Sequence, residues 1–560
     1  MIIDAFTISA DEELTTDICI VGAGPAGITL ARELAGQDFR VCLLESGGFE
    51  KPDAATRSLG EVETLGDFVQ IGTENRNRRF GGNSSYWGVN LPHTEIGLRL
   101  VPLDRADFEQ RDWVPHSGWP FTYDDLLPYY ERAQSVIGSG PFAYEAEDWA
   151  DADAPQLKFA SDRLQTRIFQ FGNGALFFDQ YRRTLSQSKN VTTLLHANAV
   201  ELETDDSGRT VTRVRVATVE GKAFWIRAQQ VILAAGAVEN THLLLLSNKT
   251  QASGLGNQHD QVGRYFMDHP LVHGGLFIPS DPSLFNRTAL YDLRQVNGVS
   301  IMGGLTLSDA ALHREKLLNI AAWIFPRAKQ FRSAEAIASL KVLLSGKGLT
   351  GGLKTLQHHA QTIMSGLDDV SESIWRKVSG QSLPYWPTLA NGGWSHLQDH
   401  KESVYGVFEV LHITEQTPDP ENRLVLGAGT DQLGRQAICH VSCWSEQDKD
   451  GIRRAWQVLS EEIERAGLGQ FIPETEDGEF ILASPGASHH IGVTRMHNDP
   501  KQGVVDANCQ VHGLSNLFIS SSSVFPTGGY ANPTLTIVAL SLRLADRIKA
   551  MMQCRVLERC

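Results

Sequence analysis

The sequence has few cysteines, and none are arranged as in metal-binding or haem-binding motifs. Its seven cysteines form no CxxC, no CxxCH and no pair of doublets at zinc-site spacing. No apolar run approaches the roughly 18 residues that a membrane span needs. Residues 1–17 lack the basic start and apolar core of a signal peptide. We therefore expect a cytoplasmic protein with reduced thiols, without a membrane span and without a metal site.

The sequence also lacks an excess of basic residues, and its formal net charge is -16. This charge disfavours a nucleic-acid-binding surface and attraction to anionic lipid, so neutral or cationic small molecules suit it better. The content of 42% hydrophobic and 21% charged residues is typical of a soluble globular protein. Because 560 residues exceed one typical core, we expect two or more large domains.

The N-terminal part shows a strand–helix–strand pattern. "DICIVG" at 17–22 and "RVCLLES" at 40–46 have the composition of buried strands, and "PAGITLARELAG" between them has helical apolar spacing. This βαβ unit predicts a Rossmann-like, doubly wound α/β domain. Because further apolar strands recur far along the chain, we expect this domain to be assembled from three segments: 14–95, 188–270 and 486–553.

The middle of the chain has a different pattern. Stretches such as "SVYGVFEVLHITE" at 403–415 alternate apolar and polar residues, which predicts a mostly antiparallel sheet with one covered face. We assign 96–187 and 271–485 to this second, substrate-binding domain, so that the whole chain is α+β. Residues 333–380 predict a helical insert, whose role as a solvated face, lid, partner surface or membrane contact is open.

The loop "VGAGPAG" carries the first chemical signal. Gly22, Gly24 and Gly27 have GxGxxG spacing between the predicted strand and helix. Such glycines allow a tight turn, close approach to a pyrophosphate and close helix–strand packing, while the helix N-terminus favours phosphate charge. Glu45 ends the next strand, where a carboxylate can accept the ribose hydroxyls. The loop predicts dinucleotide binding and leaves NAD and FAD both open.

Two later segments favour a flavin. "RRFGGNSSYWG" at 78–88 combines adjacent glycines with serines and a tryptophan, which suits close approach to a flat ligand. A Gly-rich surface turn is the alternative. From Gly503 onward, a strand leads through a Ser/Pro/Gly loop to "NPTLT" and a long helix.

With these segments, the chain resembles the glucose-methanol-choline (GMC) family of FAD-dependent oxidoreductases. The glycine loop, "GGNSSYW", "VILAAGAVENTHLL", "VGRYFMDHP", "HHIGVTRM" and "NPTLT" follow in the family's order. The sequence is most similar to the branch of bacterial pyranose and glycoside oxidases and sugar dehydrogenases. The resemblance implies FAD and assigns its contacts to these positions: Gly22, Gly24, Gly27, Glu45, Gly81, Gly82, Ser84, Trp87, Val200, Ala235, Pro533 and Thr534.

The resemblance also distinguishes the neighbouring His489 and His490, of which an extended chain can direct only one at a site. The family's histidine lies six residues before the arginine, here Arg495, which selects His489. Its partner precedes "PTLT" and is Asn532. A neutral imidazole, with an ordinary pKa near ~6.5, can take a hydroxyl proton. An amide can donate a hydrogen bond to the same oxygen.

Other interpretations of these residues stay open. Asn532 followed by Pro533 is also a typical helix start, with Asn as N-cap. We expect packing and hydrogen-bonding roles for His490, Arg495 and His497, and assign no role to His269. Tyr86 stands where some relatives have the histidine that bonds covalently to FAD, so we predict dissociable FAD.

Two more positions depart from the family's pattern. Val493 replaces the signature threonine, and the serine run at 520–523 stands where relatives often have an aspartate. The serine hydroxyls can replace some of its hydrogen bonds but not its charge.

The resemblance predicts oxidation of a secondary alcohol of a sugar, glycoside or cyclitol-like polyol. His489 takes the proton, and oxygen or a quinone-like acceptor reoxidises the cofactor. Two alternatives are a flavin-containing lyase of the hydroxynitrile lyase type and a flavin-binding interaction protein.

Overall fold

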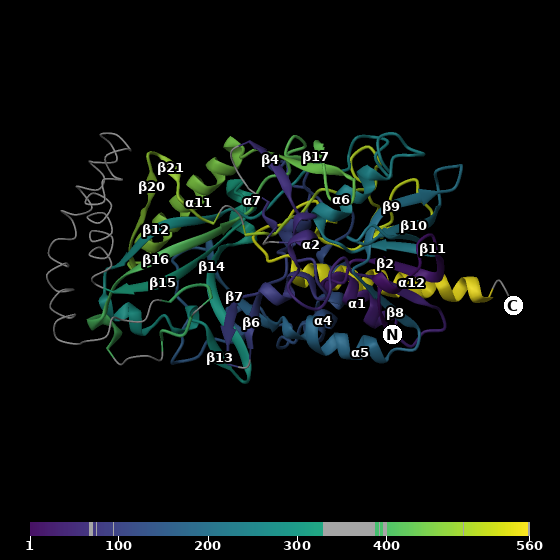
Figure 1. Cartoon of the computed structure of the whole chain (residues 1–560). Coiled ribbons are helices and arrows are strands. Elements are labelled where there is room, and N and C mark those ends of the chain that lie inside the picture. Colours follow the sequence, from purple (N-terminus) through teal and green to yellow (C-terminus); the bar gives the residue numbers. More distant parts are fainter. Residues whose placement is uncertain are drawn as a thin grey trace, which may run out of the picture.

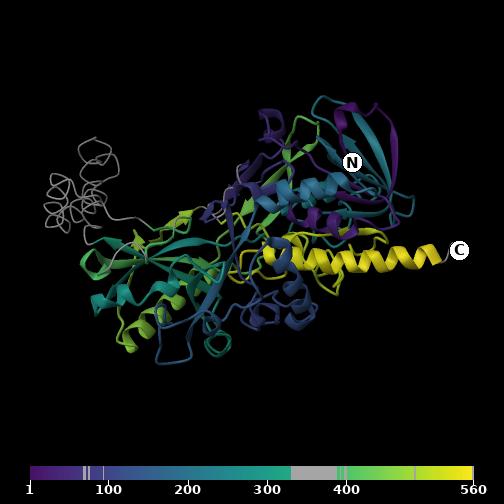
Figure 2. The same ribbon diagram turned by 90° about the horizontal axis from the view of Figure 1, so that it is seen from below.

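The computed structural model describes residues 1–66, 71–73, 76–92, 94–328, 387–390, 392–395, 400–484 and 487–557. The predicted helical insert at 333–380 lies outside these residues. Two large sheets lie side by side, and the C-terminal helix α12 (Thr534–Leu557) runs along the first of them (Figures 1 and 2). The predicted α/β and α+β fold class is confirmed.

The first sheet has eight strands in the order β1-β8-β3-β2-β11-β10-β9, with β23 paired to β11. Strands β1, β8, β3, β2, β11 and β23 pair in parallel. Strand β10 is antiparallel to both of its neighbours, β11 and β9. In sheet order, their bounds are Ile2–Asp4, Val191–Leu195, Val41–Leu44, Glu13–Val21, Ala223–Leu233, Val211–Ala217 and Asn198–Thr204, with β23 at Leu517–Ile519.

The parallel strands are apolar throughout because both faces of the sheet are covered. Ile18, Cys19 and Ile20 of β2 are fully buried, as a strand between two layers requires. Helices α1 (Pro25–Leu34) and α4 (Tyr123–Ile137) both pack against the C-terminal α12 (Thr534–Leu557). Segments from both ends of the chain therefore build the same domain.

The second sheet has ten strands, in the order β19-β12-β16-β15-β14-β7-β6-β5 with β13 and β22 attached. Neighbouring strands are antiparallel, as the alternating pattern predicts. In the same order, the bounds are Gly469–Pro473, Leu271–Pro279, Tyr405–Thr414, Ile320–Ala328, Val299–Leu307, Leu164–Asn173, Thr94–Leu100 and Val89–Leu91. Strand β13 is Arg294–Val296, and β22 is Leu482–Ser484.

The helix α11 (Glu446–Arg465) covers one face of the second sheet. Its N-terminus carries a capping box, in which the Ser445 hydroxyl accepts from the main chain of Asp448. Ile452, Trp456 and Leu459 form its buried stripe at helical spacing, and Trp456 lies near His412 of β16. Because neighbouring strand residues face opposite sides, Ile413 is left for the other face, where it lines a cavity.

Smaller elements complete the described chain. Strands β17, β18 and β4 form a three-stranded sheet, in which β4 pairs in parallel with β18. No helix of the described residues is long and apolar enough to cross a membrane. The remaining bounds are β17 Arg423–Thr430, β18 Gln436–Ser442, β4 Val62–Gly66, β20 Thr475–Glu476, β21 Glu479–Phe480, α2 Ala54–Ser58, α3 Arg105–Phe108, α5 Tyr181–Gln187, α6 Ala237–Leu246 and α7 Asp309–Glu315.

Candidate active site

The dinucleotide loop joins β2 to α1, and each of its three glycines meets a different constraint. Gly22 has φ +105°, and a Cβ there would lie 2.6 Å from the Ala234 carbonyl oxygen. A Cβ on Gly27 would lie 1.9 Å from the Gly22 carbonyl oxygen, so the close packing of helix on strand needs a glycine. A Cβ on Gly24 would meet nothing within 4 Å. Gly24 lines the cavity and leaves room for a phosphate to approach the main chain.

The carboxylate of Glu45 lies under this loop. Its Oε2 accepts from the Ala23 amide at 3.1 Å, and its Oε1 accepts from the Gly47 amide at 2.9 Å. Burial raises the pKa of Glu45, and the two amides act in the opposite direction. Glu45 lines the cavity, so its further lone pairs can accept ribose hydroxyls.

A cavity of about 750 Å³ extends from the dinucleotide loop to the second sheet. This volume suits a large cofactor. Several predicted contact residues line it: Gly22, Gly24, Glu45, Gly82, Trp87, Ala235, Pro533 and Thr534. The described lining does not include Gly27, Gly81, Ser84 or Val200, and Ala199 lies at the wall beside Val200. Ser84 is fully buried, and its hydroxyl donates to the Gly81 carbonyl at 2.8 Å, which stabilises the turn.

His489 and Asn532 meet at the cavity wall although 43 positions separate them. The Nδ2 amide of Asn532 lies 3.0 Å from Nε2 of His489. The Oδ1 atom of Asn532 is buried and has no hydrogen-bond partner within the described part of the chain. Its side chain is therefore directed at the histidine, and the helix itself begins at Thr534.

A second histidine lies behind the first. Nδ1 of His269 is 2.9 Å from Nδ1 of His489, so one ring must donate the proton and the other accept it. The buried Asp268 carboxylate accepts from the main-chain amides of both histidines, at 2.7 Å for His269 and 2.8 Å for His489. The "FMDHP" segment therefore positions His489, a role that the sequence did not reveal.

Burial keeps both rings neutral. Burial is the largest cause that holds the pKa of His489 well below its ordinary value, and the nearby His269, Arg99 and His490 add to it. Burial also lowers the pKa of His269 to about 4. Burial raises the pKa of Asp268 to about 6. His489 is therefore a neutral imidazole at neutral pH.

The remaining polar residues of this loop have structural contacts. The expectation that only one of the two neighbouring histidines faces the site is wrong, because His490 also lines the cavity. It is buried, and its ring lies near that of Phe266, with centroids 5.5 Å apart. Arg495 donates to the His116 carbonyl at 2.6 Å. His497 Nδ1 accepts from the Asp499 amide at 2.9 Å.

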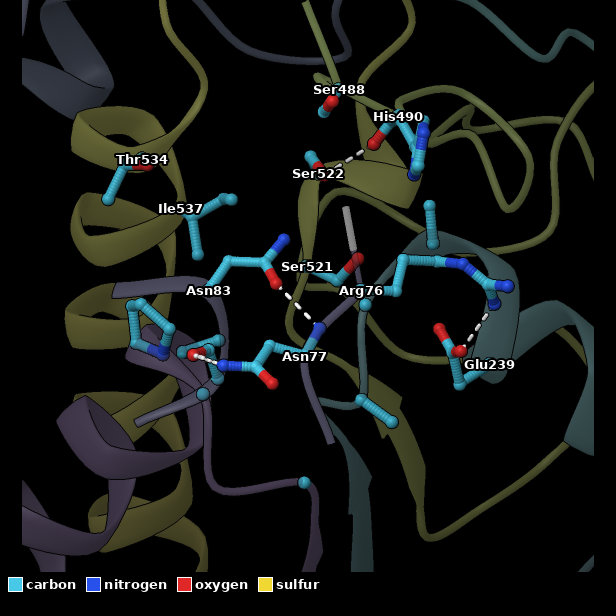
Figure 3. A pocket seen from close by; sticks show the side chains of 18 of the residues that line it. Arg76, Asn77, Asn83, Glu239, Ser488, His490, Ser521, Ser522, Thr534 and Ile537 are labelled. Carbon is cyan, nitrogen blue, oxygen red and sulfur yellow. Dashed lines mark hydrogen bonds and ion pairs between the residues drawn. The ribbon is translucent and has the colours of Figure 1, made fainter. Parts of the chain in front are cut away.

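Sequence reasoning missed a group of polar residues on the cavity wall. Figure 3 shows Arg76 paired with Glu239. It also shows the main-chain amide of Asn77 donating to Oδ1 of Asn83 at 2.7 Å. Ser521 lies at the same wall, within the serine run. The "RNRR" run at 76–79 is an unusual basic cluster in an acidic chain, and it is the signal that could have identified Arg76.

Comparison with known proteins assigns this architecture. The family model described as "FAD dependent oxidoreductase" matches residues 17–255, and the model described as "GMC oxidoreductase" matches residues 418–541. Paromamine 6'-oxidase of Streptomyces fradiae is 30% identical over 96% of this chain and 92% of that protein. The chain belongs to the GMC oxidoreductase family. It is an FAD-dependent enzyme.

Two further relatives match this GMC oxidoreductase over nearly its whole length. The fructose dehydrogenase large subunit of Gluconobacter japonicus is 23% identical over 96% of this chain and 98% of that protein. 6'''-hydroxyparomomycin C oxidase of Streptomyces lividus is 23% identical over 95% and 91%. The structure of Aspergillus oryzae formate oxidase covers 98% of this chain and 100% of its own, at 18% identity and a TM-score of 0.52. This last likeness supports the fold alone.

The glycines of the loop give a paired prediction. Gly27→Ala places a methyl group against main chain and is expected to lower the thermal midpoint of the FAD-free protein. The methyl group of Gly24→Ala points into open space, so this variant should keep the thermal midpoint of the unmodified protein. It should bind FAD more weakly, because the methyl group lies where a phosphate approaches the main chain. Thermal unfolding and FAD titration of both FAD-free variants measure this. Equal midpoints for the two variants would contradict the assignment.

Proposed function

We propose that this GMC oxidoreductase oxidises a secondary alcohol of a sugar, glycoside or cyclitol-like polyol. The observation that carries the proposal is the 3.0 Å contact between Asn532 and His489 at the wall of the FAD-sized cavity. The names of two relatives, paromamine 6'-oxidase and fructose dehydrogenase, add support for hydroxyl oxidation on a carbohydrate.

The residues present fit FAD. Gly24 leaves an open path to the main chain, Glu45 lines the wall beside the loop, and the N-terminus of α12 lies at the cavity. This helix end favours negative charge nearby. FAD, when bound, would supply the acceptor for the carbinol hydride, with oxygen or a quinone-like compound as the final electron acceptor.

His489 is the proposed base. Its Nε2 atom takes the hydroxyl proton while the Nδ2 amide of Asn532 donates to the alcohol oxygen. For Nε2 to accept, the proton of His489 must sit on Nδ1, from which it is donated to Nδ1 of His269. The same contact holds after Nε2 is protonated, because Nδ1 remains a donor. We therefore assign His269 as a positioning residue that fixes the tautomer.

Removal of the base tests the function directly. His489→Ala is expected to retain FAD and to lower the rate of flavin reduction by about 10²- to 10⁴-fold, the usual contribution of a general base. Anaerobic stopped-flow spectroscopy with a panel of polyols measures this, with the exposed His259→Ala as control. Flavin that stays oxidised with every polyol in the unmodified enzyme would overturn the proposal. Cyanohydrin cleavage without flavin bleaching would instead indicate the lyase.

The pKa of His489 sets the direction of the pH dependence. The proton-accepting form predominates above that pKa, which lies well below the ordinary 6.5. We expect kcat/KM to stay level as the pH falls through 6.5 and to decline only in more acid solution, because kcat/KM reports the free enzyme. A steady-state profile from about pH 5 to 8 measures this. A midpoint at or above 6.5 would contradict a neutral, buried base.

The linkage of FAD is a separate prediction. Tyr86 lines the cavity with half of its surface exposed, and its phenol is a poor substitute for the imidazole nitrogen that forms the link in some relatives. Acid or heat denaturation should therefore release the yellow colour to the supernatant. Flavin that stays with the precipitate after washing would show a covalent link.

A further inference from the structure

Arg99 is a cationic side chain at the wall of the active-site cavity. It lies on β6 and lines the same cavity as His489 and Asn532. Its guanidinium carbon is 3.9 Å from the ring centroid of Trp323 and 5.9 Å from that of Phe169. These rings come from β15 and β7 of the second sheet. They hold the cation against the sheet side of the cavity.

The guanidinium of Arg99 has no counter-ion in the part of the chain that the structure describes. Its Nε and Nη1 atoms are buried without a hydrogen-bond partner, and among the described residues no carboxylate pairs with it. Burial alone lowers the pKa of Arg99 to about 9, so the side chain is still cationic at neutral pH. An unpaired buried charge destabilises a fold, which makes a bound anion the expected partner.

Three other arginines of the enzyme that are buried or partly buried have carboxylate partners. The pairs are Arg111 Nη1 with Glu415 at 3.0 Å, Arg167 Nη2 with Asp104 at 3.1 Å, and Arg327 Nε with Glu409 at 2.7 Å. Arg495 is also buried without a carboxylate partner, but its guanidinium donates to the His116 carbonyl at 2.6 Å. Arg99 differs from the three paired arginines because no carboxylate of the described residues reaches it.

Arg99 is linked to Asn532 by packing and to His489 by its charge. The Phe169 ring packs against Tyr530, with centroids 6.1 Å apart, and Tyr530 lies two residues before Asn532. The charge of Arg99 is one of the causes that lower the pKa of His489. An anion bound at Arg99 would offset this charge and so make His489 a stronger base.

We propose that Arg99 binds a carboxylate of the substrate, so that the alcohol oxidised beside His489 belongs to a polyhydroxy acid of the aldonic or uronic type. This inference rests on the proposed alcohol oxidation. A guanidinium forms charge-assisted hydrogen bonds with a carboxylate, and Arg99 brings this group to the cavity wall. The net charge of -16 favours neutral or cationic ligands, but salt screens that field within about 8–10 Å. Inside the cavity, the charge of Arg99 therefore affects ligand preference more than the net charge of the chain does.

Matched acidic and neutral alcohols test the proposal. The holoenzyme is reduced anaerobically with gluconate, galacturonate, galactose, sorbitol and glucosamine, and kcat/KM is measured for each. We expect an acid to be preferred over its neutral counterpart. Arg99→Met should lower the acid-to-neutral ratio by about ten- to a hundredfold, the usual range for a charge-assisted hydrogen bond. Arg99→Lys, which keeps the charge but not the planar guanidinium, should give an intermediate ratio.

The control is Arg215→Met on β10, which removes one half-exposed charge from the other sheet and should keep the ratio. Arg99→Met is also expected to match or exceed the thermal midpoint of the unmodified protein, because it removes an unpaired charge. Neutral polyols that reduce the flavin as well as the acids do, with equal losses in Arg99→Met, would overturn this proposal alone. Flavin that no alcohol reduces would overturn the proposed function as well.

Discussion

The geometry of the site depends on the buried carboxylate of Asp268. One of its oxygens accepts from the main-chain amides of His269 and His489, which come from segments 220 positions apart. Because hydrogen bonds to a charged group are stronger than those between neutral groups, this contact fixes both main chains. A short antiparallel bridge between Met267 and Ile491 supports it. The imidazoles then meet through Nδ1, and Nε2 of His489 is left to face Asn532.

The sequence predicted those parts of the molecule that depend on local pattern. The βαβ unit around Gly22 has a 3.6-residue helix between apolar strands, and β2, α1 and β3 lie where these patterns place them. The antiparallel second sheet followed from alternation in segments such as β16. Assignment of His489 and Asn532 needed a known family, because no local rule links positions 43 apart.

Contacts between distant side chains could not be predicted in this way. "FMDHP" contains no sign that His269 lies behind His489, since that contact depends on how the two segments cross. Arg99 resembles any strand arginine in the sequence, and its unpaired state is visible only once its neighbours Trp323 and Phe169 are placed. His490 differs from expectation for the same reason: strand alternation alone would direct it away from the site, but it packs beside Phe266 and lines the cavity together with His489.

The pairing of β4 with β18 joins residues 62–66 to residues 438–442, and β23 at 517–519 completes the first sheet beside β11. These strand pairs join residues far apart in the sequence. Such pairs form slowly, because the long stretch of chain between the two strands must first be brought together. During synthesis, the N-terminal βαβ unit leaves the ribosome several hundred residues before its last partners. The cofactor cavity is therefore a late product of folding. Until then, the edge of β11 at Val231–Leu233, which later pairs with β23, is a short surface on which nascent chains can aggregate.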